Sequence, residues 1–210
     1  MNDVQEVPYM IYAESTPNPA SIKFVSNKML VHTGASFEFQ NVAHAKHSPL
    51  ARKLFEFPFV KIVFISANYV TITRHDFVHW DDILLETRSF ISNFLNEKGI
   101  IFESEILVGN PVDSSENMTA PAHPFSGHAT PKNESEAKII EVLEQYIRPS
   151  VEQDGGMISF QSLKDGVVTV QMKGSCSGCP SSTMTLKAGI EGLLKKLLPD
   201  EVKEVVSAES

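Results

Sequence analysis

The pattern of apolar and polar positions in the first half of the chain predicts strands interspersed with two helices. Short runs of alternating, β-branched or aromatic residues predict strands at 21–25, 29–33, 37–40, 60–65 and 69–73. Apolar residues at helical spacing predict a short helix over 48–57, which Ser48 can cap, and a longer helix over 81–98, which ends at Gly99. We therefore predict an α+β domain over residues 1–108.

A second set of periodic segments lies near the end of the chain. A helix is predicted from the capping residue Asn133 to the residue before Pro149, and a β-hairpin follows over 158–172 with an Asp-Gly turn. A loop with two cysteines, a second helix and an edge strand over 202–206 complete the pattern. We predict a small α+β domain over 134–210, in the order helix, strand, strand, cysteine loop, helix, strand.

The segment between these domains has no periodicity. Residues 109–133 hold Pro111, Pro121, Pro124 and Pro131 among Ser, Asn, Thr, Ala and His, with hardly any aliphatic side chains. Such a composition cannot bury enough apolar surface to offset the entropy of ordering it. The predicted fold class is therefore two small α+β domains joined by a flexible, Pro-rich linker.

The net charge and the opening residues exclude several classes of protein but do not indicate a function. Lys and Arg number 18 against 26 Asp and Glu, and the resulting net charge of -8 does not suit a nucleic-acid partner. The first eight residues have two acids and no base, unlike a secretory signal or a transit peptide, and no apolar run is long enough to cross a bilayer. These observations predict a cytoplasmic protein that binds neither nucleic acid nor membrane.

The candidate chemistry lies in the only two cysteines, Cys176 and Cys179. Their loop lies between a predicted strand end and a predicted helix start, with glycines and serines around them and Pro180 after them. The positive end of the helix dipole should favour thiolate over thiol, and the glycines should let backbone N–H groups approach sulfur or an anionic cluster. The pair is therefore predicted to ligate a metal centre.

Several types of site remain open for a C-x-x-C pair. An intrachain zinc site needs four ligands, and no histidine is near the pair in sequence. A thioredoxin-like disulfide exchanger normally carries its motif after the first strand of a βαβ unit, whereas only a hairpin comes before it here. The two cysteines could also be incidental thiols that bind no metal. An iron–sulfur cluster needs four thiolates, which two chains related by a two-fold axis would supply together.

The motifs around the cysteines closely resemble the NifU-like (Nfu) domain. The matching residues are Ile147-Arg148-Pro149, Asp154-Gly155-Gly156, Gly174 to Ser182 and Thr185 to Glu191. The first domain is similar to the Nfu N-terminal domain, through Ser15 to Pro19, Ser48 to Ala51, Leu54-Phe55, Val63-Phe64, Thr71 to Thr73 and Trp80. The resemblance covers nearly the whole chain apart from the linker and the extreme termini.

This resemblance implies a cluster scaffold or carrier that is not an enzyme. Cys176 and Cys179 would be the metal ligands, and a [4Fe-4S] cluster would bridge a homodimer that forms when the cluster binds. The cluster would pass to apo iron-sulfur proteins, and the first domain would recognise these clients or other cluster assembly factors. The alternative reading is a thiol–disulfide oxidoreductase that uses the same cysteine pair.

Other polar pairs are better explained without metal chemistry. We expect His75 and His79 to be solvated or packed, and Asp81 and Asp82 to be acids at a helix start. The remaining pairs, His44 with His47 and His123 with His128, have no third ligand at metal spacing.

Overall fold

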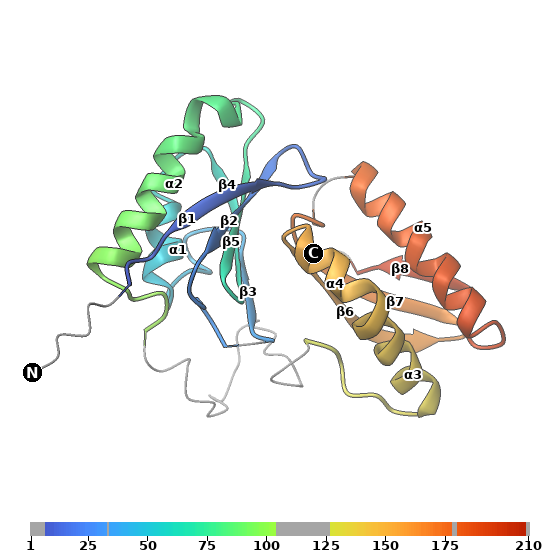
Figure 1. Cartoon of the computed structure of the whole chain (residues 1–210). Coiled ribbons are helices and arrows are strands. Elements are labelled where there is room, and N and C mark those ends of the chain that lie inside the picture. The colour runs from blue at the N-terminus through green and yellow to red at the C-terminus, as the bar shows by residue number, and fades with distance from the viewer. Residues whose placement is uncertain (1–6, 33, 104–126, 178–179, 209–210) are drawn as a thin grey trace, which may run out of the picture.

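A five-stranded antiparallel sheet forms the N-terminal region of the computed structural model (Figure 1). The spatial order is β1-β2-β5-β4-β3. The strands are β1 (Ile11–Ser15), β2 (Ser21–Ser26), β3 (Ser36–Phe39), β4 (Val60–Ser66) and β5 (Tyr69–Arg74). The structure describes residues 7–32, 34–103, 127–177 and 180–208, with the backbone alone described at 180–183.

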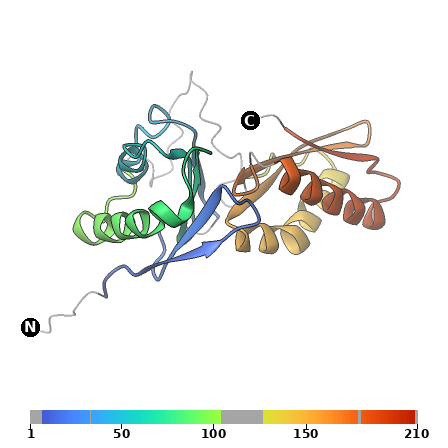
Figure 2. The ribbon, with the colours of Figure 1, turned by 90° about the horizontal axis from the view of Figure 1, so that it is seen from above.

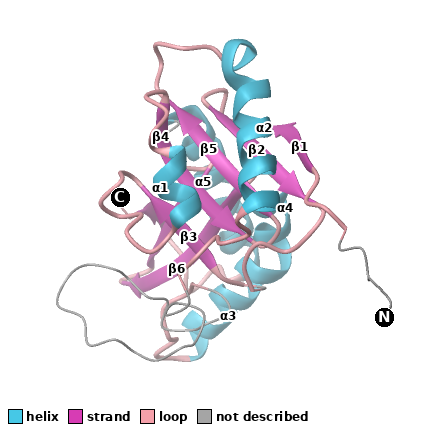
Figure 3. Cartoon of the chain, turned by 90° about the vertical axis from the view of Figure 1, so that its left-hand side faces the viewer, coloured by secondary structure: helices cyan, strands magenta, loops and turns pink. Residues whose placement is uncertain are grey.

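Two helices, α1 (Pro49–Leu54) and α2 (Trp80–Glu97), cover one face of this sheet. Figure 3 is seen from their side and shows both helices in front of the strands. Strand residues alternate between the two faces, so Val70 and Ile72 of β5 join the helices in the core. Tyr69 and Thr71 point to the opposite face, where they are also buried.

The two helices begin at the residues that their sequences indicate. The Ser48 hydroxyl accepts a hydrogen bond from the Ala51 amide, and Pro49 occupies the first turn of α1. Asp81 and Asp82 lie in the first turn of α2, where they complement the helix dipole as predicted.

The C-terminal region is a three-stranded sheet with helices on one face, as Figure 2 shows. Strands β6 (Gly156–Lys164) and β7 (Val167–Gly174) form the predicted hairpin, and β8 (Glu204–Ser207) adds to β7 in parallel. The helical elements are α3 (Glu134–Val142), the π-helical turn η1 (Leu143–Ile147), α4 (Arg148–Gln153) and α5 (Pro180–Leu197). The two-domain α+β fold class is therefore confirmed.

Three local predictions differ from the structure. Residues 29–32 form no strand, because the amides of Leu30 and Val31 both donate to one carbonyl, that of Ala67, instead of to a neighbouring strand. Strand β1 was not predicted. Helical structure does not stop before Pro149, because Pro149 occupies the first turn of α4, where no amide hydrogen is needed.

The described end of the predicted linker packs against the C-terminal region. His128 is 1% exposed, and the Ala129 amide donates to the Phe160 carbonyl at 2.8 Å. Residues 109–126 of the predicted linker lie outside the described residues. Within the described part of the chain, no helix is long and apolar enough to cross a membrane.

Candidate functional site

Cys176 lies in a tight turn between β7 and α5, as the sequence predicts. The turn begins at Gly174, whose φ of +68° favours glycine, and the Ser177 amide donates to the Gly174 carbonyl at 3.1 Å. Cys179 lies outside the described residues. The assignment of both cysteines as ligands therefore stays a prediction.

The Asp154-Gly155-Gly156 motif forms one wall around Cys176. Gly156 pairs with Gly174 in the β6–β7 register, and the Ser175 amide donates to the Gly155 carbonyl at 3.2 Å. A Cβ atom on Gly156 would lie 2.6 Å from the Cys176 sulfur. The motif that matched the Nfu resemblance thus brings bare backbone against the sulfur, which only glycine permits.

Burial sets the protonation state of Cys176 in this arrangement. The residue is 7% exposed, and its burial raises the pKa of the thiol to about 11. The Ser175 hydroxyl, 3.8 Å from the sulfur, acts in the opposite direction, and the Asp154 carboxylate raises the pKa further. For Cys176, the direction of this shift is opposite to the predicted stabilisation of a thiolate, because the loss of hydration outweighs the polar groups nearby.

Side chains from the N-terminal sheet contact the turns around Cys176. The Thr71 hydroxyl donates to the Gly155 carbonyl at 2.7 Å, and the Tyr69 hydroxyl donates to the Gly156 carbonyl at 3.1 Å. The Asn18 side-chain amide donates to the Ser175 carbonyl at 3.1 Å. The Lys23 ammonium donates to the Gln153 carbonyl at 3.1 Å.

One carboxylate of the N-terminal region accepts hydrogen bonds from the cysteine turn. Glu38 of β3 accepts from the Gly174 amide at 2.7 Å and from the Ser177 hydroxyl at 3.4 Å. Burial raises the pKa of Glu38, while these two donors and the nearby Lys173 act to lower it. Burial also raises the pKa of Tyr69, so its hydroxyl remains a proton donor.

We name six residues of the N-terminal region the docking face: Asn18, Lys23, Glu38, Phe64, Tyr69 and Thr71. They are not among the residues that the sequence pattern indicates as a site. A signal is present in β5, where Tyr69, Thr71 and Thr73 alternate with Val70 and Ile72. This alternation shows that one face of the strand is polar, but it does not reveal the partner of that face.

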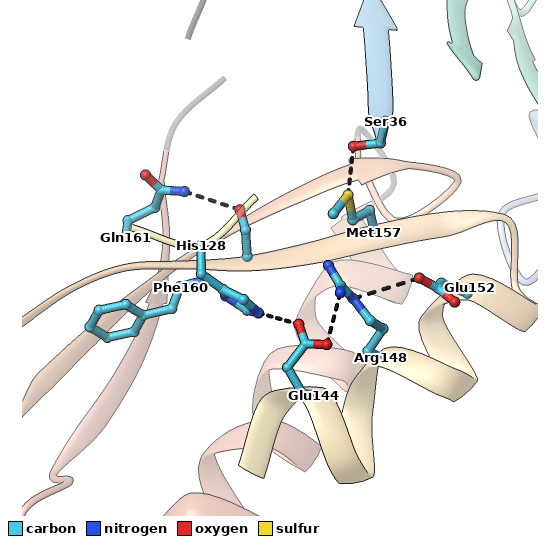
Figure 4. A network of polar contacts seen from close by, with 9 residues as sticks. Ser36, His128, Glu144, Arg148, Glu152, Met157, Phe160 and Gln161 are labelled. Atoms are coloured by element: carbon cyan, nitrogen blue, oxygen red, sulfur yellow. Dashed lines mark hydrogen bonds and ion pairs between the residues drawn. The ribbon is translucent and has the colours of Figure 1, made fainter. Parts of the chain in front are cut away.

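The histidines do not form a metal centre in the described residues. His128 accepts a hydrogen bond from the Phe160 amide at 2.7 Å and bonds Glu144 through its other ring nitrogen. Arg148 donates to the second oxygen of Glu144 at 2.8 Å and pairs with Glu152 (Figure 4). His128 therefore links the segment that precedes α3 to the helices of the C-terminal region.

The other candidate ligands are also dispersed. His75 stacks on the Phe77 ring, and His47 lies 3.9 Å from a Glu103 carboxylate oxygen. His123 lies outside the described residues. Among the residues that the structure describes, no three His, Cys, Asp or Glu side chains form a group that could hold a metal ion.

Comparison with known families assigns both regions. Residues 11–98 match the model "Scaffold protein Nfu/NifU N terminal", and residues 139–206 match the "NifU-like domain". The "NFU1 iron-sulfur cluster scaffold homolog, mitochondrial" of Homo sapiens is 35% identical over 210 residues, which cover 97% of this chain and 75% of that one. The chain belongs to the Nfu family.

Two further Nfu relatives give the same result over most of the chain. "NifU-like protein 4, mitochondrial" of Arabidopsis thaliana is 35% identical over 198 residues, covering 93% of this chain and 64% of that protein. The homologue of Drosophila willistoni, which has the same name as the human protein, is 35% identical over 190 residues, covering 90% of this chain and 61% of that protein. This Nfu chain thus spans 61–75% of the length of these three relatives.

The names of these Nfu relatives correct one expectation. All three are mitochondrial, so the predicted cytoplasmic location is wrong. That prediction depended on the first eight residues and on the lack of an apolar run long enough to cross a bilayer, and neither observation identifies the compartment.

Proposed function

We propose that this Nfu chain is an iron–sulfur cluster scaffold of mitochondria. In this proposal, Cys176 and Cys179 of two subunits bind one [4Fe-4S] cluster, and the holo form transfers the cluster to apo-proteins. The observation that carries the proposal is the placement of Cys176 in a glycine-lined turn between β7 and α5. The names of the relatives support a scaffold rather than an enzyme.

The number of thiols supports a shared cluster. A [4Fe-4S] cluster takes four thiolates, and each chain has two cysteines. Two chains related by a two-fold axis would therefore complete the ligand set. Since few protein groups would hold a cluster at such an interface, it could leave more readily than a cluster held by four cysteines of one chain.

Transfer would proceed by ligand exchange without a change in oxidation state. A thiolate of the recipient forms a bond to iron as the bond from iron to a donor cysteine breaks, and a proton returns to the donor sulfur. Four such exchanges move the cluster. The N-terminal region would hold the recipient or an assembly factor near the donor and so raise its effective concentration.

Anaerobic reconstitution with ferrous iron and sulfide tests this proposal. We expect about two irons per chain and a shift from the apo mass to a dimer. Cys176→Ser and Cys179→Ser should each abolish cluster binding while leaving the far-UV circular dichroism unchanged, because serine is close to cysteine in size. Thr169→Ser, a conservative change further back along β7, is the matched control and should bind like the unmodified chain.

Two outcomes would count against the proposal. A colourless protein that binds no iron and does not dimerise would end it. Full cluster binding by either cysteine variant would refute the ligand assignment.

The alternative function, thiol–disulfide exchange, uses a thiolate as its nucleophile. Burial raises the pKa of the Cys176 thiol to about 11, which disfavours Cys176 as that nucleophile. We expect no reduction of insulin disulfides in the presence of dithiothreitol beyond the uncatalysed rate.

A further inference from the structure

Where the N-terminal and C-terminal regions touch, hydrogen-bond donors of one region meet acceptors of the other. Four donors of the docking face, from Asn18, Lys23, Tyr69 and Thr71, meet four backbone carbonyls that flank the cysteine turn. A polar group that loses water must find such a partner or destabilise the structure. Asn18 is 2% exposed and Thr71 is 1% exposed, so these donors depend on the other region for their hydrogen bonds.

Shape is matched as well as polarity. A Cβ atom on Gly155 would lie 2.8 Å from the Thr71 hydroxyl, and one on Gly174 would lie 2.8 Å from a ring carbon of Phe64. Phe64 and Tyr69 also form a small apolar cluster with Met157 of β6. The glycines that border the cysteine turn thus also allow the docking face to approach.

The contact covers the turns on both sides of Cys176. The docking face bonds Gly155 and Gly156 on one side, and Gly174, Ser175 and Ser177 on the other. A cluster shared with a second chain requires Cys176 to face that chain, whereas here the residue is 7% exposed. Cys176 itself packs in the core of the C-terminal region, and the docking face occupies the surface of the turn residues on either side of it. A second chain that shares a cluster with this one would need that surface uncovered.

We infer that the docking face is a binding surface for the cysteine turn of the C-terminal region and holds the apo chain in a closed form that cannot load a cluster. This inference rests on the proposed scaffold function. Cluster loading then requires the two regions to separate. By thermodynamic linkage, cluster binding weakens docking by the same factor as docking weakens cluster binding. The docking face affects cluster binding only through its contacts with the cysteine turn, and none of its residues is a ligand of the cluster.

The test compares two double variants of the full chain. Tyr69→Phe with Thr71→Val removes two hydroxyl donors to the cysteine turn and keeps the size of both side chains. Tyr12→Phe with Thr73→Val is the matched control, because Tyr12 is 50% exposed and the Thr73 hydroxyl bonds Ser21 within its own region. Equal thermal melting of the N-terminal region in both variants shows that its fold is intact.

The first measurement is the alkylation rate of Cys176 by N-ethylmaleimide in the apo chain. A Cys179→Ser background makes Cys176 the only thiol. We expect about tenfold faster alkylation in the docking variant, since two net hydrogen bonds are lost, and no change in the control. Equal rates in the two variants would overturn the inference, because docking would then not protect the turn.

The second measurement is cluster loading of the variants with both cysteines present. We expect half-loading at a several-fold lower iron concentration in the docking variant than in the control. Faster alkylation with unchanged loading would overturn the inference and leave the proposed function standing. Failure of every form, including the unmodified chain, to bind iron would overturn both.

Discussion

At Gly156, the backbone passes too close to Cys176 for any side chain to fit between them. A Cβ atom there would lie 2.6 Å from the sulfur and 2.8 Å from the Lys173 carbonyl oxygen. The carbonyl belongs to the β6–β7 hairpin and cannot move without disturbing it. We expect Gly156→Ala to lower the free energy of unfolding of the C-terminal region by about 1–3 kcal/mol in urea titrations followed by circular dichroism.

Gly192 of α5 provides the matched control for this substitution. A Cβ atom on Gly192 would meet nothing within 4 Å. Gly192→Ala should therefore leave stability unchanged or raise it by up to about 1 kcal/mol, since alanine favours a helix. Equal loss of stability in both variants would show that the crowding at Gly156 is not the cause.

Individual side chains show where prediction from the sequence stops. The place of Cys176 between a strand and a helix follows from local pattern. The pKa of Cys176 could not be predicted, because it depends on burial in the folded core. The glycines beside Cys176 also contact residues 84 and 87 positions away in the chain.

Among the elements, α1 depends on one capping residue. The Ser48 hydroxyl accepts from the Ala51 amide at 3.2 Å and donates to the Ile101 carbonyl at 2.9 Å, and Ser48 is completely buried. Ser48→Ala removes both bonds and should lower the free energy of unfolding of the N-terminal region by about 1–2 kcal/mol, measured by thermal and urea unfolding.

His79, the residue before α2, makes no side-chain capping bond and is the control for that prediction. His79→Ala should change stability by less than about 0.5 kcal/mol. A comparable loss in both variants would mean that the cap of α1 contributes nothing specific.

Elements with a strong local signal were predicted correctly, and those that depend on distant partners were not. The hairpin β6–β7 has an Asp-Gly turn, and both Asp165 and Gly166 adopt the positive φ that such a turn requires. Residues 29–33 have the composition of a strand, but Leu30 and Val31 bond the β4–β5 turn at Ala67 instead. That partner could not be identified from the local sequence.

On the scale of the whole molecule, two regions were predicted from periodicity, but their contact was not. The polar alternation of β5 is compatible with an exposed face, and only the fold shows that the C-terminal region covers it. Interfaces of this kind join residues far apart in sequence and leave no local period to detect.

The docking of the two regions should depend on pH through Glu38. Burial raises the pKa of this carboxyl in the docked form, against the opposing effects of the Gly174 amide, Lys173, Ser177 and Gln40. A raised pKa means that the docked form holds the proton more tightly. Docking is therefore strongest below the ordinary glutamate pKa and weakens as pH rises through the raised value.

Small-angle X-ray scattering of the apo chain measures this dependence. We expect the radius of gyration to increase as the pH rises above the ordinary glutamate pKa. Glu38→Gln should remove most of that increase, whereas Glu86→Gln, at an exposed position on α2, should retain it. A pH dependence in Glu38→Gln equal to that of the unmodified chain would rule out Glu38 as the titrating group.

The burial of Cys176 also bears on how the chain survives while it is empty. Peroxide attacks thiolates that solvent can reach, and successive oxidations of a cysteine become irreversible. A thiol that is 7% exposed, with its pKa raised to about 11, is protected on both counts. In the proposed scaffold, the N-terminal sheet would thus preserve the sulfur of the empty chain until iron arrives.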